Sequence, residues 1–257
     1  MVKKTSFANH KGGVSKSSSA LATGQLIARA KQRVLFVDMD AQGNLSHSLR
    51  ADPNKGNVWD VLTKEKTAEK AVQRTQWGDC LCSSPQLTGS DKKLDIIGKE
   101  YLLKEALDTV SDKYDYIFID PPPSLGILMV NSLVASDYVI IPTLADIYSL
   151  IGIGEIFKTI VSIRKYCNPE LQIAGILITR YKGNTNISRE ISQMIEETAK
   201  KLNTKVFSSR IREAVAVREA EAARIDLFSL APKSIASMDY LEFAKELLGD
   251  LNARKES

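Results

Sequence analysis

Cysteine and histidine are scarce in this sequence, which has three cysteines and two histidines among 257 residues. Cys80 and Cys82 alternate along a segment with the pattern of a strand, and Cys167 lies far from both in the chain. Only two histidines are available in the chain to complete any metal site with these thiols. The sequence therefore predicts neither a disulfide framework nor a cysteine and histidine metal site, but three buried free thiols.

Long apolar runs, linkers and repeats are also missing. No apolar run approaches the roughly 20 residues that a membrane-spanning helix needs. The amino-terminal stretch has basic residues but no apolar core of the kind found in signal peptides. No linker rich in Pro, Gly or Ser and no internal repeat divides the chain. We therefore expect a cytoplasmic protein that folds as one domain over residues 1–257.

Charge is modest in total but uneven along the chain. The composition is 44% hydrophobic and 26% charged, as in ordinary globular proteins, and the net charge is +4. Residues 200–233 contain eight basic and four acidic side chains and so account for a net +4 by themselves. A local basic excess on a neutral body favours a surface that meets polyanions.

The strongest functional signal is the stretch Asn9 to Ser18, NHKGGVSKSS. It follows a short apolar-alternating run at 5–8 and precedes a helix-forming run at 19–30. A strand, a glycine loop, Lys-Ser and a helix are the parts of a phosphate cradle, in which loop N–H groups and a lysine meet one anion. The usual pattern has glycine before the lysine, where this chain has Ser15, so a plain Gly-Gly turn with an incidental lysine is the alternative.

Two further motifs place aspartates at the ends of apolar runs. Residues 33–38 end in Asp38-Met-Asp40, and residues 114–120 end in Asp120 followed by three prolines. Carboxylates at the carboxyl ends of parallel strands point into the crevice where α/β sheets bind ligands. Asp120 fits a carboxylate that holds Mg²⁺ directly or through water. A helix cap is the alternative for one aspartate of the first pair.

The remaining pattern predicts an α/β fold with a mostly parallel twisted sheet flanked by helices on both faces. Further strands are expected at 138–142 and 171–180, and helices at 149–166, 188–202 and 234–251. Residues 45–93 have a weaker pattern, with short helices near 57–62 and 67–74 and a strand near 79–83. A strand end followed by a helix is expected over 94–113.

These motifs together resemble the ParA/Soj partition ATPases, which belong to the deviant Walker A, MinD-like class of P-loop NTPases. KGGVSKSS is similar to the family's KGGVGKTT, VDMDAQGN to its VDxDPQGN, and FIDPPPSLG to its IDxPPSLG. Residues 211–220 and 231–234 are similar to the family's later blocks. The resemblance extends over nearly the whole chain.

The resemblance implies ATP and Mg²⁺ as cofactors and assigns a role to each motif. Lys16 would contact the β- and γ-phosphates, and Lys11 would reach the partner's ATP across a nucleotide sandwich dimer. Asp40 would orient the attacking water. The remaining implied nucleotide contacts are Gly12, Gly13, Val14, Ser15, Ser17, Ser18, Thr179 and Arg180, of which Thr179 and Arg180 would meet the adenine. The implied magnesium residues are Ser17, Asp38 and Asp120.

The resemblance further implies a DNA segregation ATPase associated with the nucleoid. ATP would close a homodimer, the dimer would bind DNA without sequence specificity, and a ParB-like partner would stimulate hydrolysis. The candidate DNA contacts are Lys200, Lys201, Lys205, Arg218 and Arg224. A solvated helix face is the alternative for each of these five.

Two other functions stay open at this point. A MinD-like membrane-surface ATPase would need a C-terminal amphipathic helix with a basic polar face, whereas the polar face at 239–250 is mostly acidic. A nucleotide-locked scaffold that hydrolyses ATP poorly is the other. It is suggested by Ser15 and by Ala41, which stands where the family has proline.

Overall fold

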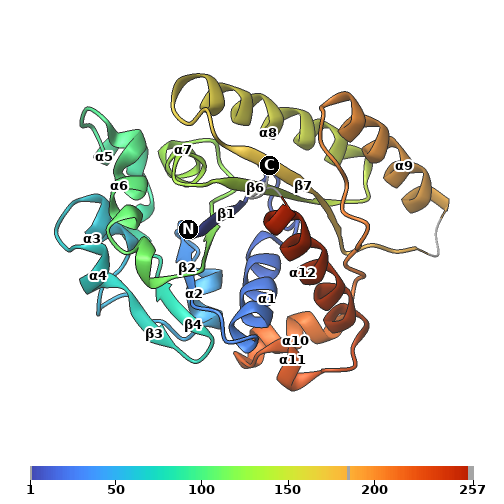
Figure 1. The fold of residues 1–257 in the computed structure, drawn as a ribbon, viewed down its shortest axis with the longest axis horizontal. Coiled ribbons are helices and arrows are strands. Elements are labelled where there is room, and N and C mark those ends of the chain that lie inside the picture. The colour runs from blue at the N-terminus through green and yellow to red at the C-terminus, as the bar shows by residue number, and fades with distance from the viewer. Residues whose placement is uncertain (1, 184–185, 254–257) are drawn as a thin grey trace.

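A computed structural model describes residues 2–183 and 186–253. Within these residues a seven-stranded sheet has the order β3-β4-β2-β5-β1-β6-β7 (Figure 1). Neighbouring strands run parallel except for the antiparallel pair of β3 and β4. The strands are β1 (Lys3–Phe7), β2 (Val34–Asp38), β3 (Gln73–Thr75), β4 (Gly78–Leu81), β5 (Tyr116–Asp120), β6 (Tyr138–Leu144) and β7 (Gln172–Thr179).

Helices cover both faces of this sheet, which confirms the predicted fold class. The longer ones are α1 (Lys16–Arg29), α6 (Leu102–Asp108), α7 (Ile127–Val134), α8 (Ile147–Tyr166), α9 (Asn186–Lys201), α10 (Val215–Ala223) and α12 (Ile235–Ala253). The short ones are α2 (Asn44–Ser48), α3 (Val58–Leu62), α4 (Ala68–Ala71), α5 (Ser90–Lys93) and α11 (Leu227–Leu230). In Figure 1, α1 and α12 lie on one face, and α7, α8 and α9 lie on the other.

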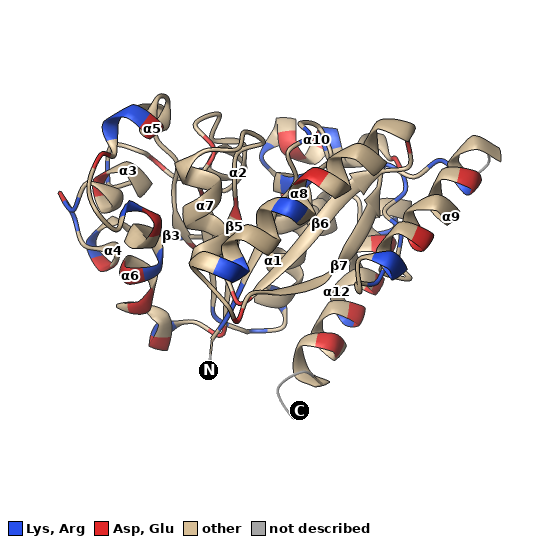
Figure 2. Cartoon of the chain, turned by 90° about the horizontal axis from the view of Figure 1, so that it is seen from above, with Lys and Arg blue, Asp and Glu red and all other residues tan. Residues whose placement is uncertain are grey.

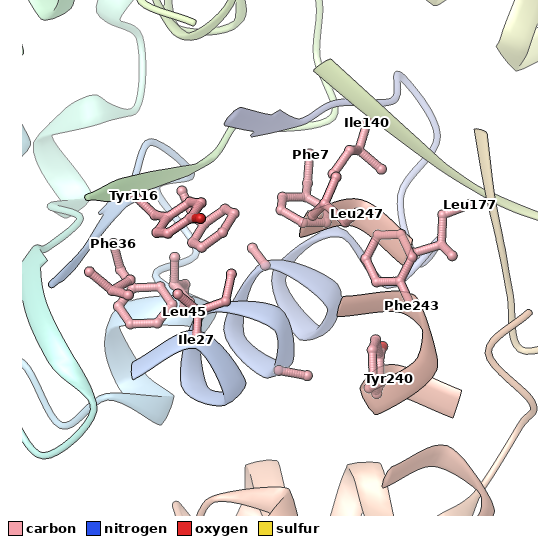
Figure 3. Packing of buried hydrophobic residues seen from close by; sticks show 14 of the residues in the cluster. Phe7, Ile27, Phe36, Leu45, Tyr116, Ile140, Leu177, Tyr240, Phe243 and Leu247 are labelled. Carbon is pink, nitrogen blue, oxygen red and sulfur yellow. The ribbon is translucent and has the colours of Figure 1, made fainter. Parts of the chain in front are cut away.

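The core follows from the alternation of side chains along the strands. In β2, Phe36 faces α1 and α12, whereas Leu35 and Val37 face α3 and α6. Strands buried on both faces read as continuous apolar runs, which is why β2 and β5 stand out in the sequence. Figure 3 shows the α1 and α12 side of the core, where Phe243 and Leu247 of α12 pack close to Phe7.

The segment between β2 and β5 differs from expectation. Residues 67–74 were expected to be one helix, but α4 has four residues and Gln73–Thr75 is the edge strand β3. The strand end expected near 94 is absent from the described residues, and α7 has no counterpart among the expected helices. Three 3₁₀ turns lie in this part of the chain, at Pro85–Leu87, Lys99–Tyr101 and Ser111–Lys113.

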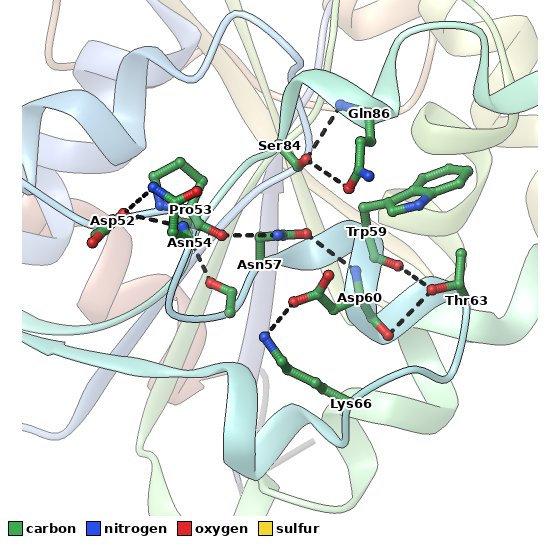
Figure 4. Close-up of polar contacts among 12 residues, drawn as sticks. Asp52, Pro53, Asn54, Asn57, Trp59, Asp60, Thr63, Lys66, Ser84 and Gln86 are labelled. Carbon is green, nitrogen blue, oxygen red and sulfur yellow. Dashed lines mark hydrogen bonds and ion pairs between the residues drawn. The ribbon is translucent and has the colours of Figure 1, made fainter.

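Local polar contacts add to the apolar packing of this segment. The Asn57 side chain accepts a hydrogen bond from the Asp60 N–H at 3.1 Å, and the Lys66 ammonium pairs with the Asp60 carboxylate at 2.8 Å (Figure 4). Ser84 caps the 3₁₀ turn that follows it by accepting from the Gln86 N–H. Such contacts leave no hydrophobic repeat in the sequence, which explains why the pattern here is weak.

The cysteines are free thiols, as expected. Cys80 and Cys82 are fully buried, and Cys167 is partly buried. None of the helices within residues 2–183 and 186–253 combines the length and the apolar character needed to cross a bilayer.

Gly24 in the middle of α1 gives a test of this packing. A Cβ added there would lie 2.2 Å from Cε1 of Phe36, so Gly24→Ala should lower the free energy of unfolding by about 1–3 kcal/mol. Gly249 in α12 has open space around it, so Gly249→Ala should raise the free energy of unfolding by about 0.5–1 kcal/mol through helix propensity. Urea unfolding measures both, and equal effects would contradict the packing described for α1.

Candidate nucleotide-binding site

The motifs singled out in the sequence meet at the carboxyl edge of the central strands. The loop after β1, the turn after β2 and the end of β5 are neighbours there, because β2, β5 and β1 are adjacent in the sheet. They enclose a cavity of about 430 Å³. Its lining includes the predicted residues Gly12, Gly13, Ser15, Lys16, Ser17, Ser18 and Asp40, together with Asn44, His47, Pro123 and Glu221.

The loop of residues 9–15 has the backbone shape of a phosphate cradle. Gly13 has φ 72°, and Ser15, which directly precedes α1, has φ 61° and ψ 34°. Both residues are in the left-handed region, which is costly for serine because of its Cβ. The turn delivers the first N–H groups of a 14-residue helix to the cavity.

The loop is anchored from behind by polar side chains. Thr179, at the end of β7, is fully buried, and its hydroxyl donates to the carbonyl oxygens of Val14 and Thr143 at 3.1 Å each. Asn9 donates to the Pro142 carbonyl at 2.7 Å. The structure therefore places Thr179 and the buried Val14 side chain behind the loop, and not in the cavity as expected for an adenine contact.

Asp120 is a buried carboxylate without a hydrogen-bond donor. It is 1% exposed, and neither of its oxygens has a hydrogen-bond partner among the described residues. Burial, and then the charge of Asp38, raise its pKa well above the ordinary value, while the nearby Ser17 hydroxyl and then the charge of Lys16 oppose this shift. Burial in turn lowers the pKa of Lys16, and the charges of Asp120 and Asp40 oppose that shift.

This arrangement fits a hard divalent cation. The buried Asp120 carboxylate does not line the cavity itself, but it lies next to Ser17 and Lys16, which do. Magnesium prefers oxygen ligands and usually takes one or two from the protein and the rest from phosphates and water. No cluster of three or more His, Cys, Asp or Glu side chains suited to a metal occurs in the described ranges. The donor set thus fits Mg²⁺ held together with a nucleotide.

Asp38 differs from Asp120, its neighbour across β2 and β5. Its Oδ2 accepts hydrogen bonds from the N–H and hydroxyl of Ser46 at 2.8 and 2.7 Å, and its Oδ1 accepts from the Asp40 N–H at 3.2 Å. Burial raises the pKa of Asp38 to about 6 against the effect of these bonds. Both oxygens of Asp38 thus accept hydrogen bonds that hold the Asp40 turn, and the magnesium role implied for Asp38 stays a prediction.

The turn that carries Asp40 has Ala41 where the family has proline, and hydrogen bonds hold it in place. The Asp40 carbonyl accepts from the Gly43 N–H at 2.9 Å and from the Ser83 hydroxyl. The Ser83 N–H in turn donates to the Ser46 hydroxyl at 2.8 Å. Ala41 also packs against the apolar cluster beneath the turn. Ser46 and Ser83 were not singled out from the sequence, because no motif links them to Asp40.

Lys11 lies outside this cavity. Its ammonium pairs with the Asp146 carboxylate at 2.6 Å and lies 5.8 Å from the centre of the Tyr148 ring. Asp146 also caps α8 by accepting from the Ser149 N–H at 2.9 Å. Lys11 therefore points towards α8, away from the phosphate loop of its own chain.

A second cavity of about 270 Å³ adjoins the first, with which it shares Gly13, Ser15, Ser18 and Glu221. Arg180 lines it and pairs with Glu213 at 2.8 Å, and its contact with adenine stays a prediction. Ile211 and Val217 supply apolar surface. The space is suited to a flat, partly apolar group linked to whatever occupies the phosphate cradle.

The structure divides the five basic candidates into two groups. Arg218 lines the second cavity, and Arg224 donates to His47 at 2.9 Å. Lys200 and Lys201 lie exposed at the far end of α9, which begins at the carboxyl edge after β7. Lys205 is paired with Asp250 and, at 3.6 Å, with Glu246. Figure 2 shows acidic residues interleaved with basic ones along α9 and α12, which weakens the case for a polyanion surface there.

Comparisons with known proteins give a consistent result. A family model described as an AAA domain matches residues 2–173. The chain is 35% identical over 253 residues to the sporulation initiation inhibitor protein Soj of Bacillus subtilis, covering 96% of this chain and 98% of that protein. It is 32% identical over 247 residues to the chromosome partitioning protein ParA of Myxococcus xanthus, covering 94% of this chain and 86% of that protein.

Among solved structures, one similar to this chain is a protein of Mycobacterium smegmatis named cobyrinic acid a,c-diamide synthase, with bound ATP analog and magnesium. The TM-score is 0.84 at 31% identity, covering 96% of this chain and 95% of that chain. Its name refers to a different reaction from partitioning, so the comparison bears on the fold and on a nucleotide site of this type.

The left-handed Ser15 yields a test of the loop. Ser15→Gly should raise the free energy of unfolding by about 0.5–1 kcal/mol, because glycine removes the Cβ that the positive φ disfavours. Ser15→Ala is the matched control and should give no gain, since it keeps the Cβ and the Ser15 hydroxyl makes no cap hydrogen bond. Thermal unfolding of the three proteins measures this, and an equal stability of all three would mean that the loop is not strained at Ser15.

Proposed function

Because the chain belongs to the ParA/Soj family of P-loop partition ATPases, we propose that it binds and hydrolyses ATP to control a DNA-binding homodimer. The observation that carries the proposal is the unpaired, buried Asp120 beside Lys16 at the base of the phosphate cradle. Burying such a carboxylate in its ionised form costs free energy unless a cation is bound next to it in the active protein. A magnesium nucleotide supplies that cation.

The proposed chemistry assigns a task to each side chain. The N–H groups of residues 13–18 and the Lys16 ammonium hold phosphate oxygens and stabilise the charge that spreads over them during phosphoryl transfer. Ser17 and Asp120 hold Mg²⁺, which screens the phosphates when it is bound. Asp40, fixed through Ser83 and Ser46, orients the attacking water.

A dimer face is supported by the surroundings of Lys11. Ile147, Tyr148 and Ile151, at the start of α8, are 61%, 70% and 63% exposed and form apolar surface next to the Lys11 and Asp146 pair. Exposed apolar surface of this kind favours a partner. The Lys11 and Asp146 ion pair is partly exposed and so contributes only about 0–1 kcal/mol to the stability of the fold. Lys11 can therefore leave this pair at small cost in free energy to reach a nucleotide in a second copy.

Contacts with DNA are proposed for the α10 side of the molecule. Arg218 is exposed and lies on a helix that lines the nucleotide cavities, so its position can depend on the bound nucleotide. Lys205 is excluded from our choice because Asp250 and Glu246 already neutralise it. A partner protein of the ParB type would then stimulate hydrolysis and release the DNA.

The membrane-surface alternative has less support. Tyr240, Phe243, Leu247 and Leu251 of α12 are buried against the sheet and α1. The apolar stripe of this helix is therefore occupied by the core and is not free to lie in a lipid interface.

The dimer face can be tested on α8 itself. Ile151→Asp should weaken ATP-dependent dimerisation by about tenfold or more, because it places a charge in an apolar interface. Val161→Asp is the control: Val161 is 46% exposed on the same helix, about 15 Å further along. Sedimentation with a non-hydrolysable ATP analogue and Mg²⁺ measures the dimer. Equal weakening by both substitutions would argue against this face.

The proposed function is tested by DNA binding and liposome sedimentation run side by side with ATP, ADP and no nucleotide. We expect DNA retention that requires ATP and falls steeply with salt, because phosphate contacts release counterions. Arg218→Ala should weaken binding to all sequences and reduce the salt slope by about one, whereas Lys200→Ala should change neither. ATP-dependent binding to liposomes without DNA binding would instead favour the membrane alternative.

A further inference from the structure

Glu221 is an acidic side chain at a place where a polyanion is expected to bind. It lies on α10, lines both cavities, and accepts a hydrogen bond from the hydroxyl of Ser18 in the first turn of α1. A carboxylate this close to the phosphate cradle repels phosphate groups. The Ser18 hydroxyl alone offsets little of that repulsion, so Glu221 requires a further donor when the cradle is filled.

The layout of the two cavities determines which part of a nucleotide would supply that donor. Phosphates would lie in the first cavity, over Lys16 and Ser17, and the base would lie in the second, against Ile211 and Val217. The ribose connects base and phosphates covalently, so it would cross the boundary that the cavities share. Glu221 is one of the four residues at that boundary.

The chemistry at this boundary matches a ribose. The sugar carries the hydroxyl donors of a nucleotide, and a carboxylate is a strong acceptor for them. One Glu221 oxygen accepts from Ser18, and the other accepts no hydrogen bond from residues 2–183 and 186–253. The other three boundary residues, Gly13, Ser15 and Ser18, provide no second carboxylate.

We propose that Glu221 binds the ribose hydroxyls and makes the site selective for ribonucleotides over deoxyribonucleotides, an inference that rests on the proposed nucleotide site. On binding, one ribose hydroxyl donates to the Glu221 oxygen that accepts no hydrogen bond from the described residues, and the other takes over the oxygen that Ser18 occupies in the structure. The Ser18 hydroxyl then donates to a phosphate oxygen instead. Glu221 thus binds the sugar, while the glycine loop and Lys16 bind the phosphates.

Calorimetric titration with ATP, 2′-deoxy-ATP and 3′-deoxy-ATP tests the inference. The wild-type protein should bind at least one deoxy form about tenfold more weakly than ATP, the loss expected for a hydrogen bond to a charged group. In the Glu221→Ala variant, the ratio of the affinity for ATP to the affinity for that deoxy form should fall to about one. Affinity for ATP itself should change less, because the substitution also removes the repulsion of the phosphates.

Two further variants make the result decisive. Glu219→Ala is the matched control, since Glu219 is exposed on the same helix and lines neither cavity, and it should keep the wild-type ratio. Glu221→Gln keeps the size and one acceptor of the side chain and should give an intermediate ratio, even if Glu221→Ala is unstable in thermal unfolding.

Two outcomes would overturn separate claims. If Glu221→Ala and Glu221→Gln keep the wild-type ratio while ATP still binds, Glu221 does not contact the ribose, although the proposed function stands. If the wild-type protein binds none of the three nucleotides, the proposed function itself fails.

Discussion

The burial of Asp120 without a donor is the constraint on which the site depends. The carboxylate lies at the end of β5, between two other central strands, and is almost completely shielded from water. Burying an ionised carboxylate costs free energy unless positive charge lies nearby. Lys16, in the first turn of α1, provides part of that charge. Lys16 also lines the cavity with the glycines and serines of the loop, and our proposal that a cation and an anion bind here together rests on this arrangement.

The surrounding structure holds the loops of this site from outside the cavity. Thr179 fixes the phosphate loop to β7, and the Asp38, Ser46 and Ser83 network fixes the turn of Asp40. Each anchor connects the edge of one parallel strand with a loop from another. The polar groups are buried and paired with one another, so these loops keep one geometry despite having little apolar packing of their own.

The sequence was sufficient for the fold class and for bringing Asp40, Asp120 and the loop around Lys16 to one edge of the sheet, because each follows a strand with a clear apolar pattern. It was not sufficient for partners that come from distant segments. Ser83 lies 43 residues from Asp40, and Glu221 lies 203 residues from Ser18, with no periodicity to join them. Lys205 shows the same limit for charge: it lies in a basic segment of the sequence, but its ion pair with Asp250, 45 residues away, could not be read from the sequence pattern.

The central claim is that Asp120 and Ser17 receive Mg²⁺ together with a triphosphate bound on the loop. Its most direct test is a calorimetric titration of ATP with and without Mg²⁺ into the wild-type protein and into Asp120→Asn. We predict that Mg²⁺ strengthens ATP binding to the wild-type protein by about tenfold or more and has a much smaller effect in the variant. An ATP affinity that is independent of Mg²⁺ in the wild-type protein, or an undiminished Mg²⁺ effect in Asp120→Asn, would contradict the account.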